Sequence, residues 1–287
     1  PSMLTVFVDL LFFPLAALFL FIPLLIRNQS RNYFAVLGLL LLMFCNGMSH
    51  FAVLNDEPIM QSQALFSAVL LITVMMAIIG GRVIPMFTAN TTEIPAKPRQ
   101  KWLDRMALGL LWALLFLSLL AVSWQAPDVL LSLIYGIAAV LLGWRCAGWR
   151  FFSTFKHPLL WSLQLGYWWI VIGLLLFSGH HAGFEIPASV AMHSLTAGAM
   201  GTLILSMMSR VSLGHTGRPL VASRLISISL VMITLTALLR VFGVWFLAPI
   251  YQHIILLSVV FWTVAYGLFL IKYTPILINP RADGKEG

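Results

Sequence analysis

Long apolar runs, separated by short polar connectors, make up most of this chain. A run of about 20 apolar residues is long enough for one α-helix to cross the hydrocarbon core of a membrane. A membrane β-barrel would instead show short alternating segments rather than stretches such as LGLLLLMF. The pattern therefore predicts an all-α, polytopic transmembrane helix bundle that forms a single domain over residues 1–287. Nine runs are present, at about 4–26, 33–54, 62–80, 103–124, 128–148, 158–178, 187–208, 225–247 and 250–272.

The composition excludes most other classes of protein. Hydrophobic residues form 61% of the chain and charged residues only 9%, against about 25% charged residues in soluble domains. With a mean hydropathy of +0.98, too little polar surface exists to coat a water-soluble body. A soluble enzyme, a disordered protein and a small disulfide-rich scaffold are all excluded.

The basic residues predict how the chain is oriented. Every Lys and Arg except Arg240 falls on or beside alternate connectors, whereas the opposite connectors carry acidic residues. By the positive-inside rule the basic side is cytoplasmic, so residue 1 lies outside and the C-terminus inside. The net charge of +8 then reflects topology and contact with lipid head groups rather than nucleic-acid binding. The predicted cytoplasmic segments are loops near 27–32, 81–102, 145–156 and 209–224, and the tail 273–287.

The start of the chain is unusual for this topology. An odd number of spans combined with an external N-terminus leads us to expect further helices before residue 1. No basic segment precedes the run at 4–26, so that run does not resemble a secretory signal peptide.

Histidines gather toward the predicted outer side. His50 ends the second span, His193 lies below the interface in the seventh and His253 opens the ninth. A buried imidazole must find a partner or coordinate a ligand, which makes His193 the strongest candidate. His253 also fits an interfacial residue, and His180 and His181 fit a solvated outer loop.

Helical spacing places His193 and Met200 on one face of the seventh span. Small residues on the adjacent stripes would let a flat cofactor approach, although ordinary helix packing explains them as well. Imidazole and thioether groups suit haem iron or copper better than calcium or magnesium, which prefer oxygen ligands. We therefore expect a metal or haem site in the outer half of the membrane, with His193, His50 and His253 as its candidate ligands.

Arg240 is predicted to be the one cation inside a span, in its outer half. An isolated Arg at that depth costs at least about 2.5 kcal/mol, so an anionic partner is expected. The sequence leaves three alternatives: a pair with Asp9, contact with a cofactor carboxylate such as a haem propionate, or extension of the side chain toward the head groups.

Two cytoplasmic segments mix Gly, Pro, hydroxyl side chains and Arg, as tight re-entrant or capping loops do. They are GGRVIPMFTAN at 80–90 and SRVSLGHTGRPL at 209–220. Membrane anchoring with turn formation explains both, and binding of an anion is the alternative. No nucleotide-binding glycine motif is present. The residues that would bind the anion are Arg82, Arg210, His215 and Arg218.

These segments resemble the NnrS family, over GGRVIPMFTAN at 80–90 and HSLTAGAMGTLILSMMSRVSLGHTGRPL at 193–220. The resemblance implies a multi-pass protein of the bacterial cytoplasmic (inner) membrane that carries haem and copper and protects against nitric oxide and nitrosative stress. Family members usually have further N-terminal helices with more histidines. His193, Arg82, His215 and Arg218 lie inside the matching stretches, whereas His50, His253 and Arg240 rest on their depth alone.

Two functional classes remain open at this point. The first is a haem–copper protein that binds nitric oxide or acts as a membrane oxidoreductase, with an electron donor that the sequence does not identify. The second is a multi-span transporter or a structural membrane subunit without a prosthetic group. In both, the lipid bilayer is the partner that the composition requires.

Overall fold

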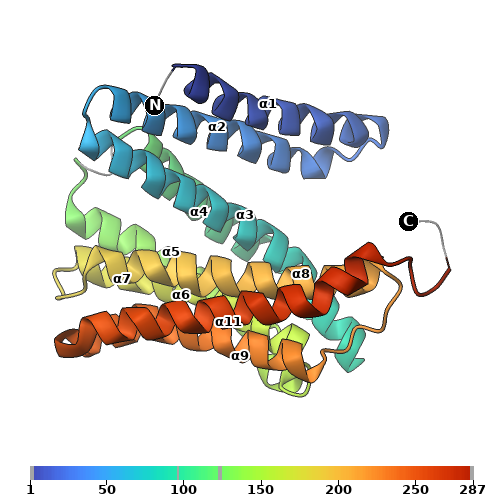
Figure 1. The fold of residues 1–287 in the computed structure, drawn as a ribbon. Coiled ribbons are helices and arrows are strands. Elements are labelled where there is room, and N and C mark those ends of the chain that lie inside the picture. Colours follow the sequence, from blue (N-terminus) through green and yellow to red (C-terminus); the bar gives the residue numbers. More distant parts are fainter. Residues whose placement is uncertain (1–2, 96, 122–124, 285–287) are drawn as a thin grey trace. The chain divides into compact units, whose positions relative to one another are not determined.

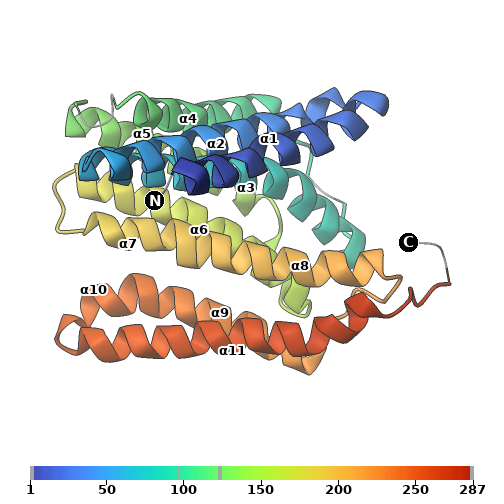
Figure 2. The same cartoon turned by 45° about the horizontal axis from the view of Figure 1, so that its top comes forward.

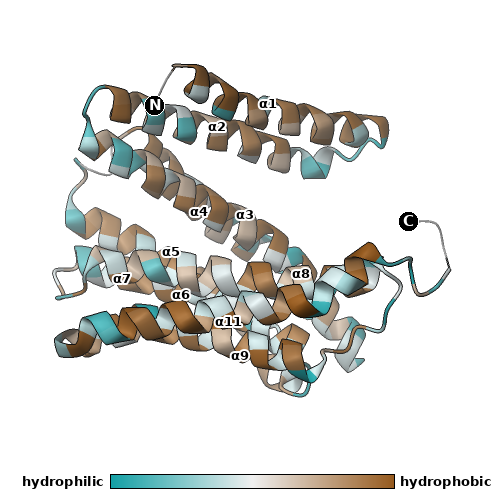
Figure 3. Ribbon diagram, in the orientation of Figure 1, coloured by the Kyte–Doolittle hydropathy of each residue, from teal (hydrophilic) through white to brown (hydrophobic). Residues whose placement is uncertain are grey.

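A computed structural model describes residues 3–95, 97–121 and 125–284 of this chain. Within those ranges the regular elements are all helical, and nine helices are long and apolar enough to cross a membrane. The predicted all-α transmembrane bundle is therefore confirmed. Figure 3 shows the expected distribution, with apolar residues along the lengths of the helices and hydrophilic residues toward many of their ends.

The chain divides into two compact units. Unit 1 comprises residues 1–75 and 108–127, and unit 2 comprises residues 76–107 and 128–287. Helices α3 (Pro58–Thr92) and α4 (Lys101–Leu119) are each divided between the two units.

Unit 1 is built around an antiparallel helical pair, α1 (Met3–Ile26) and α2 (Tyr33–Leu54), joined through the short helix η1 (Ser30–Asn32) (Figure 1). The first part of α3 packs with the second part of α4 in the same unit. There the buried amide of Gln63 donates to the carbonyl oxygen of Ser118 at 2.8 Å, and the hydroxyls of Ser67 and Ser118 lie 2.7 Å apart. These bonds satisfy polar groups that the apolar helix interior would otherwise leave unpaired.

Unit 2 is organised around α6, whose residues are largely buried. Helix α5 packs along α6, and α9 packs along α11, as both views show (Figures 1 and 2). Glycines allow α6 to approach its neighbours closely, because a Cβ at Gly166 would overlap Leu203 and one at Gly173 would overlap Leu195. The elements are α5 (Asp128–Ala147), η3 (Phe151–Thr154), α6 (Pro158–His181), α7 (Ala188–His193), η4 (Ser194–Met200), α8 (Gly201–His215), α9 (Arg224–Leu238), η5 (Leu239–Gly243), α10 (Val244–Phe246), η6 (Ala248–Ile250) and α11 (Tyr251–Ile278).

The helices run further than the apolar runs predict. Helix α3 continues to Thr92 through Pro85, so the expected loop over 81–102 is wrong for residues 81–92. Ile84 is fully buried beside that proline, and burial of this segment favours the helix although the proline removes one helical hydrogen bond. Helix α8 likewise extends to His215, so the predicted loop over 209–224 begins later. At the other end of unit 2, α6 continues to His181, which places both histidines of its last turn in a helix rather than in a loop.

Candidate functional site

Two π-helical segments pack against each other in unit 2, and they define the candidate site. Segment η4 follows α7 directly, and segment η5 follows α9. Helix α7 also contacts η5. The π-helix, with i→i+5 hydrogen bonds, is rare, and it frequently occurs at functional sites as a single turn inside an α-helix. We call this place the π site.

His193 is the last residue of α7 and borders η4. Its Nδ1 lies 2.5 Å from the carbonyl oxygen of Ser189, one turn earlier. A carbonyl only accepts, so Nδ1 carries the proton, and the lone pair of Nε2 is left to bind a ligand. The ring is half-buried. This is the geometry in which a protein holds a metal-binding imidazole, since the second ring nitrogen fixes its orientation.

Arg240 lies within η5 and is half-buried. It is within electrostatic range of His193. Across the residues that the structure describes, no carboxylate forms an ion pair with it. Asp9, one partner considered for Arg240, belongs to unit 1, where it accepts a hydrogen bond from Asn46 and contacts His50. Within the described part of unit 2, the arginine of the π site therefore has no carboxylate counter-ion.

A flat aromatic wall adjoins η4. The buried indole of Trp169 lies against Gly198, where a Cβ would come within 2.7 Å of the ring. Phe242, from η5, lies 5.9 Å from Trp169 between ring centroids. Ser194 donates to the carbonyl oxygen of Trp169 at 2.9 Å, which ties η4 to α6. In the described part of the chain, the buried Nε1 of Trp169 has no hydrogen-bond partner.

The remaining candidate ligands are distributed over both units. Met200 ends η4, and because the intervening residues are π-helical, the α-helical spacing that placed it on the face of His193 does not apply. His253 is exposed in the first turn of α11. His50 belongs to unit 1 and is bound to Asp9. Among the described residues, no three His, Cys, Asp or Glu side chains are grouped so that they could hold a metal ion.

The two glycine- and arginine-containing segments are in contact with each other. The guanidinium of the buried Arg210 lies over the ring of Phe87 at 4.3 Å, and its Nη2 is 3.4 Å from the hydroxyl of Thr91. Arg218 donates through Nη1 to the carbonyl oxygen of Ile276 at 3.5 Å, so it binds the last turns of α11. These arginines thus hold helices together. His215 is exposed, and binding of an anion by Arg82, Arg210, His215 and Arg218 stays a prediction.

The sequence prediction missed a buried ionic network in unit 2. Nε of Arg145 lies 2.6 Å from Oδ1 of Asp104, and its Nη1 donates to the hydroxyl of Tyr167 at 2.8 Å and to the carbonyl oxygen of Ala77 at 2.9 Å. Only 5% of the Arg145 side chain is exposed, and Arg99 binds the second oxygen of Asp104. Arg240 is therefore not the only cation within a helical span. Asp104 and Arg145 both lie near helix ends, where a charged residue usually indicates the membrane–water interface.

Comparison with known proteins identifies the family. A family model described as NnrS protein matches residues 1–281. The chain belongs to the NnrS family. The NnrS match includes the π site, the Arg145 network and both glycine- and arginine-containing segments. No curated protein and no solved structure matches the chain.

Proposed function

We propose that this NnrS protein binds haem at the π site and protects bacteria against nitric oxide and nitrosative stress from the cytoplasmic membrane. One observation carries the proposal: His193 offers an unengaged Nε2 on α7, and α7 contacts η5, whose Arg240 has no carboxylate partner among the described residues. Haem iron is often held by an imidazole nitrogen, and haem propionates pair with cations, and these two residues are of those types. Membership of the NnrS family supports the same cofactor.

Each residue of the π site has a defined part in this proposal. His193 would supply the axial ligand, and its bond to the carbonyl of Ser189 would hold the ring in place and increase its basicity. Arg240 would bind a propionate, which would remove the cost of a lone guanidinium inside a span. Trp169 and Phe242 would cover the edge of the site and exclude water. When bound, the haem would supply an iron that can take up nitric oxide and exchange an electron.

Copper fits the described residues less well than haem does. A protein copper site needs several nitrogen or sulfur ligands, and the described part of the chain holds no group of three His, Cys, Asp or Glu residues suited to a metal. His50 and His253 stay predicted ligands. We therefore assign no role to copper in the proposed function.

A reduced-minus-oxidised optical spectrum of the purified full chain, produced in haem-replete cells, tests the proposal. Iron and copper are measured in the same sample. A Soret band with about one haem per chain supports the proposed function. A colourless protein without iron, folded as judged by circular dichroism, overturns it and favours a transporter or a structural membrane subunit.

A further inference from the structure

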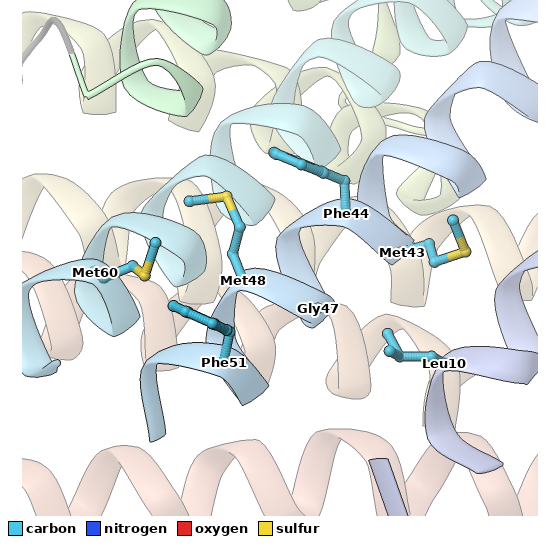
Figure 4. Close-up of a pocket in the computed structure, with 7 residues that line it drawn as sticks. All are labelled: Leu10, Met43, Phe44, Gly47, Met48, Phe51 and Met60. Carbon is cyan, nitrogen blue, oxygen red and sulfur yellow. The ribbon is translucent and has the colours of Figure 1, made fainter. Parts of the chain in front are cut away.

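A hollow on the surface of unit 1 lies where a glycine interrupts a row of large side chains. Phe44, Gly47, Met48 and Phe51 follow the spacing of one face of α2, and Gly47 contributes no side chain to that face. The cavity has a volume of about 360 Å³, and Met60 of α3 closes one side (Figure 4). Its lining is almost entirely apolar, so a water-soluble ligand is a poor match.

A cluster of three polar side chains adjoins this hollow. Leu10 lines the cavity on the α1 side, and Asp9 precedes it. Asn46 precedes Gly47, and His50 lies one turn after Gly47 on the same helix. Oδ2 of Asp9 accepts from Nδ2 of Asn46 at 2.6 Å and lies 2.8 Å from Nε2 of His50. Because residues three apart share a helix face, His50 lies on the face of α2 that carries Gly47, and its contact with Asp9 links the polar cluster to that face.

The polar cluster retains capacity for further hydrogen bonds. Within the described residues, nothing bonds to Oδ1 of Asp9 or to Nδ1 of His50. Asp9 lies about 9 Å from the start of α1, measured along the helix axis. Its side chain is nevertheless 51% exposed. A polar group that faces hydrocarbon is costly, so a ligand that brings a hydrogen-bonding atom to this place would be favoured.

We propose that this hollow binds the ring of a membrane quinone or quinol, with the oxygen-bearing edge of the ring at Asp9 and His50 and the isoprenoid tail in the bilayer. A quinone oxygen accepts a hydrogen bond and a quinol hydroxyl donates one. With Nε2–H of His50 directed at the carboxylate of Asp9, Nδ1 of His50 and Oδ1 of Asp9 can both accept from a quinol hydroxyl. A quinone oxygen can accept from Nδ1–H of the imidazolium form of His50, in which both ring nitrogens donate. An acyl chain would fill the apolar part but would leave the polar cluster unsatisfied.

The lining suits a flat aromatic ring in both shape and size. Met43, Met48 and Met60 place thioether groups around the hollow, and thioether sulfur makes favourable contacts with aromatic rings. Phe44 and Phe51 offer ring faces or edges to stack against. The volume lies at the lower end of the range of about 300–1,000 Å³ for small-molecule sites, which suits a ring head whose tail stays outside. This site is independent of haem binding at the π site.

Filling the hollow is the sharpest test. In Gly47→Leu, the new side chain enters the cavity, and its Cβ meets only Leu10 at an ordinary distance of 3.8 Å. The matched control is Gly109→Leu, also in unit 1, where a Cβ meets no heavy atom within 4 Å. The probe is decylubiquinone, titrated against each purified full chain in lipid nanodiscs. We expect Gly47→Leu to weaken binding at least tenfold and the control to leave it unchanged.

Two further measurements decide between a quinone and a lipid tail. An azidoquinone should label the unmutated protein within residues 43–60, which needs no variant to fold. Asp9→Asn and His50→Gln should each weaken decylubiquinone binding while leaving labelling by a photoreactive phospholipid unchanged. Labelling elsewhere, undiminished binding in Gly47→Leu, or equal displacement of the azidoquinone by decane would overturn the proposal. The last result would identify the hollow as a groove for acyl chains.

Discussion

The guanidinium group of Arg145 lies against the backbone of Gly81, in space that any side chain at that position would occupy. Because Gly81 has no side chain, α3 leaves space there for the arginine side chain from α5. The glycine pair at 80–81 begins the first glycine- and arginine-containing segment of this NnrS chain. Its role is to accommodate a buried charge rather than to form the turn that its composition predicts.

Gly81→Ala should destabilise unit 2 strongly. The methyl group would displace the guanidinium from Asp104 and Tyr167, and breaking a buried ion pair costs about 3–5 kcal/mol. The measurement is the free energy of unfolding in mixed micelles titrated with SDS. Gly109→Ala serves as the control, because its Cβ would enter open space. A Gly81→Ala protein as stable as that control would show that the network adapts freely.

Replacing both Asp104 and Arg145 should lower the free energy of unfolding by less than the sum of the two single replacements. Asp104→Leu should destabilise by about 3–5 kcal/mol, because it leaves the buried Arg145 without its carboxylate. Arg145→Leu should cost less, because Asp104 keeps its ion pair with Arg99. The double variant should be more stable than the sum of the two effects by about 1 kcal/mol or more. The same SDS titration provides all three values, and strict additivity would contradict the direct contact between the two side chains.

Much of the fold could be predicted from the sequence, because a membrane span is defined by the length of an apolar run. The run at 33–54 corresponds to α2, and the run at 128–148 ends one residue beyond α5. The prediction was wrong at the C-terminal end of α3, where Gly81, Arg82 and Pro85 indicate a loop by composition. Packing of buried residues such as Ile84 outweighs that local preference.

The candidate site could be predicted only in part. The depth of His193 and of Arg240 in their spans singled them out as candidates. The sequence carries no signal for η4 or η5, since a π turn differs from an α turn by one residue and not by residue type. The Arg145–Asp104 pair escaped prediction for a different reason: both residues lie close enough to helix ends to be taken for interfacial charges.

His193→Ala should abolish or shift the Soret band if His193 is the axial ligand. The bond from Nδ1 to Ser189 leaves Nε2 as the ligating atom, and alanine provides no replacement. The measurement is the optical spectrum of the purified variant at equal protein concentration. His157→Ala is the control, because His157 precedes α6 at the predicted cytoplasmic side. An unchanged spectrum for His193→Ala would remove the ligand assignment.

Arg240→Leu should accelerate haem loss roughly tenfold, while Arg240→Lys should restore part of the retention. A charge-assisted hydrogen bond contributes about 1.5–3 kcal/mol, and about 1.4 kcal/mol corresponds to a tenfold change. The rate is followed by transfer of haem to excess apomyoglobin. If both variants release haem at the unmutated rate, Arg240 does not bind a propionate.

Gly217→Ala should release the C-terminal tail from the loop after α8. Gly217 has a φ of 67°, and a Cβ there would collide with the carboxylate of Asp283. That carboxylate also holds Arg281, whose pKa it raises through their hydrogen bonds. Hydrogen–deuterium exchange should become faster at the amide of Ala282, which donates to the carbonyl oxygen of Thr216 at 3.0 Å. Gly214→Ala, whose Cβ would make only an ordinary contact, is the control.

The single π turn of η5 also determines how this protein would respond to the deletion of one residue. A π turn holds about one residue more than the α turn it replaces, so the removal of one residue can convert η5 into α-helix. Loss of one codon within 239–243 would close the turn as α-helix and leave α9 and α10 in register. The bundle would keep its packing, while Arg240 and Phe242 would leave their places beside His193 and Trp169. In this chain the loss of a single codon would therefore keep the fold of the helix bundle and remove the π site.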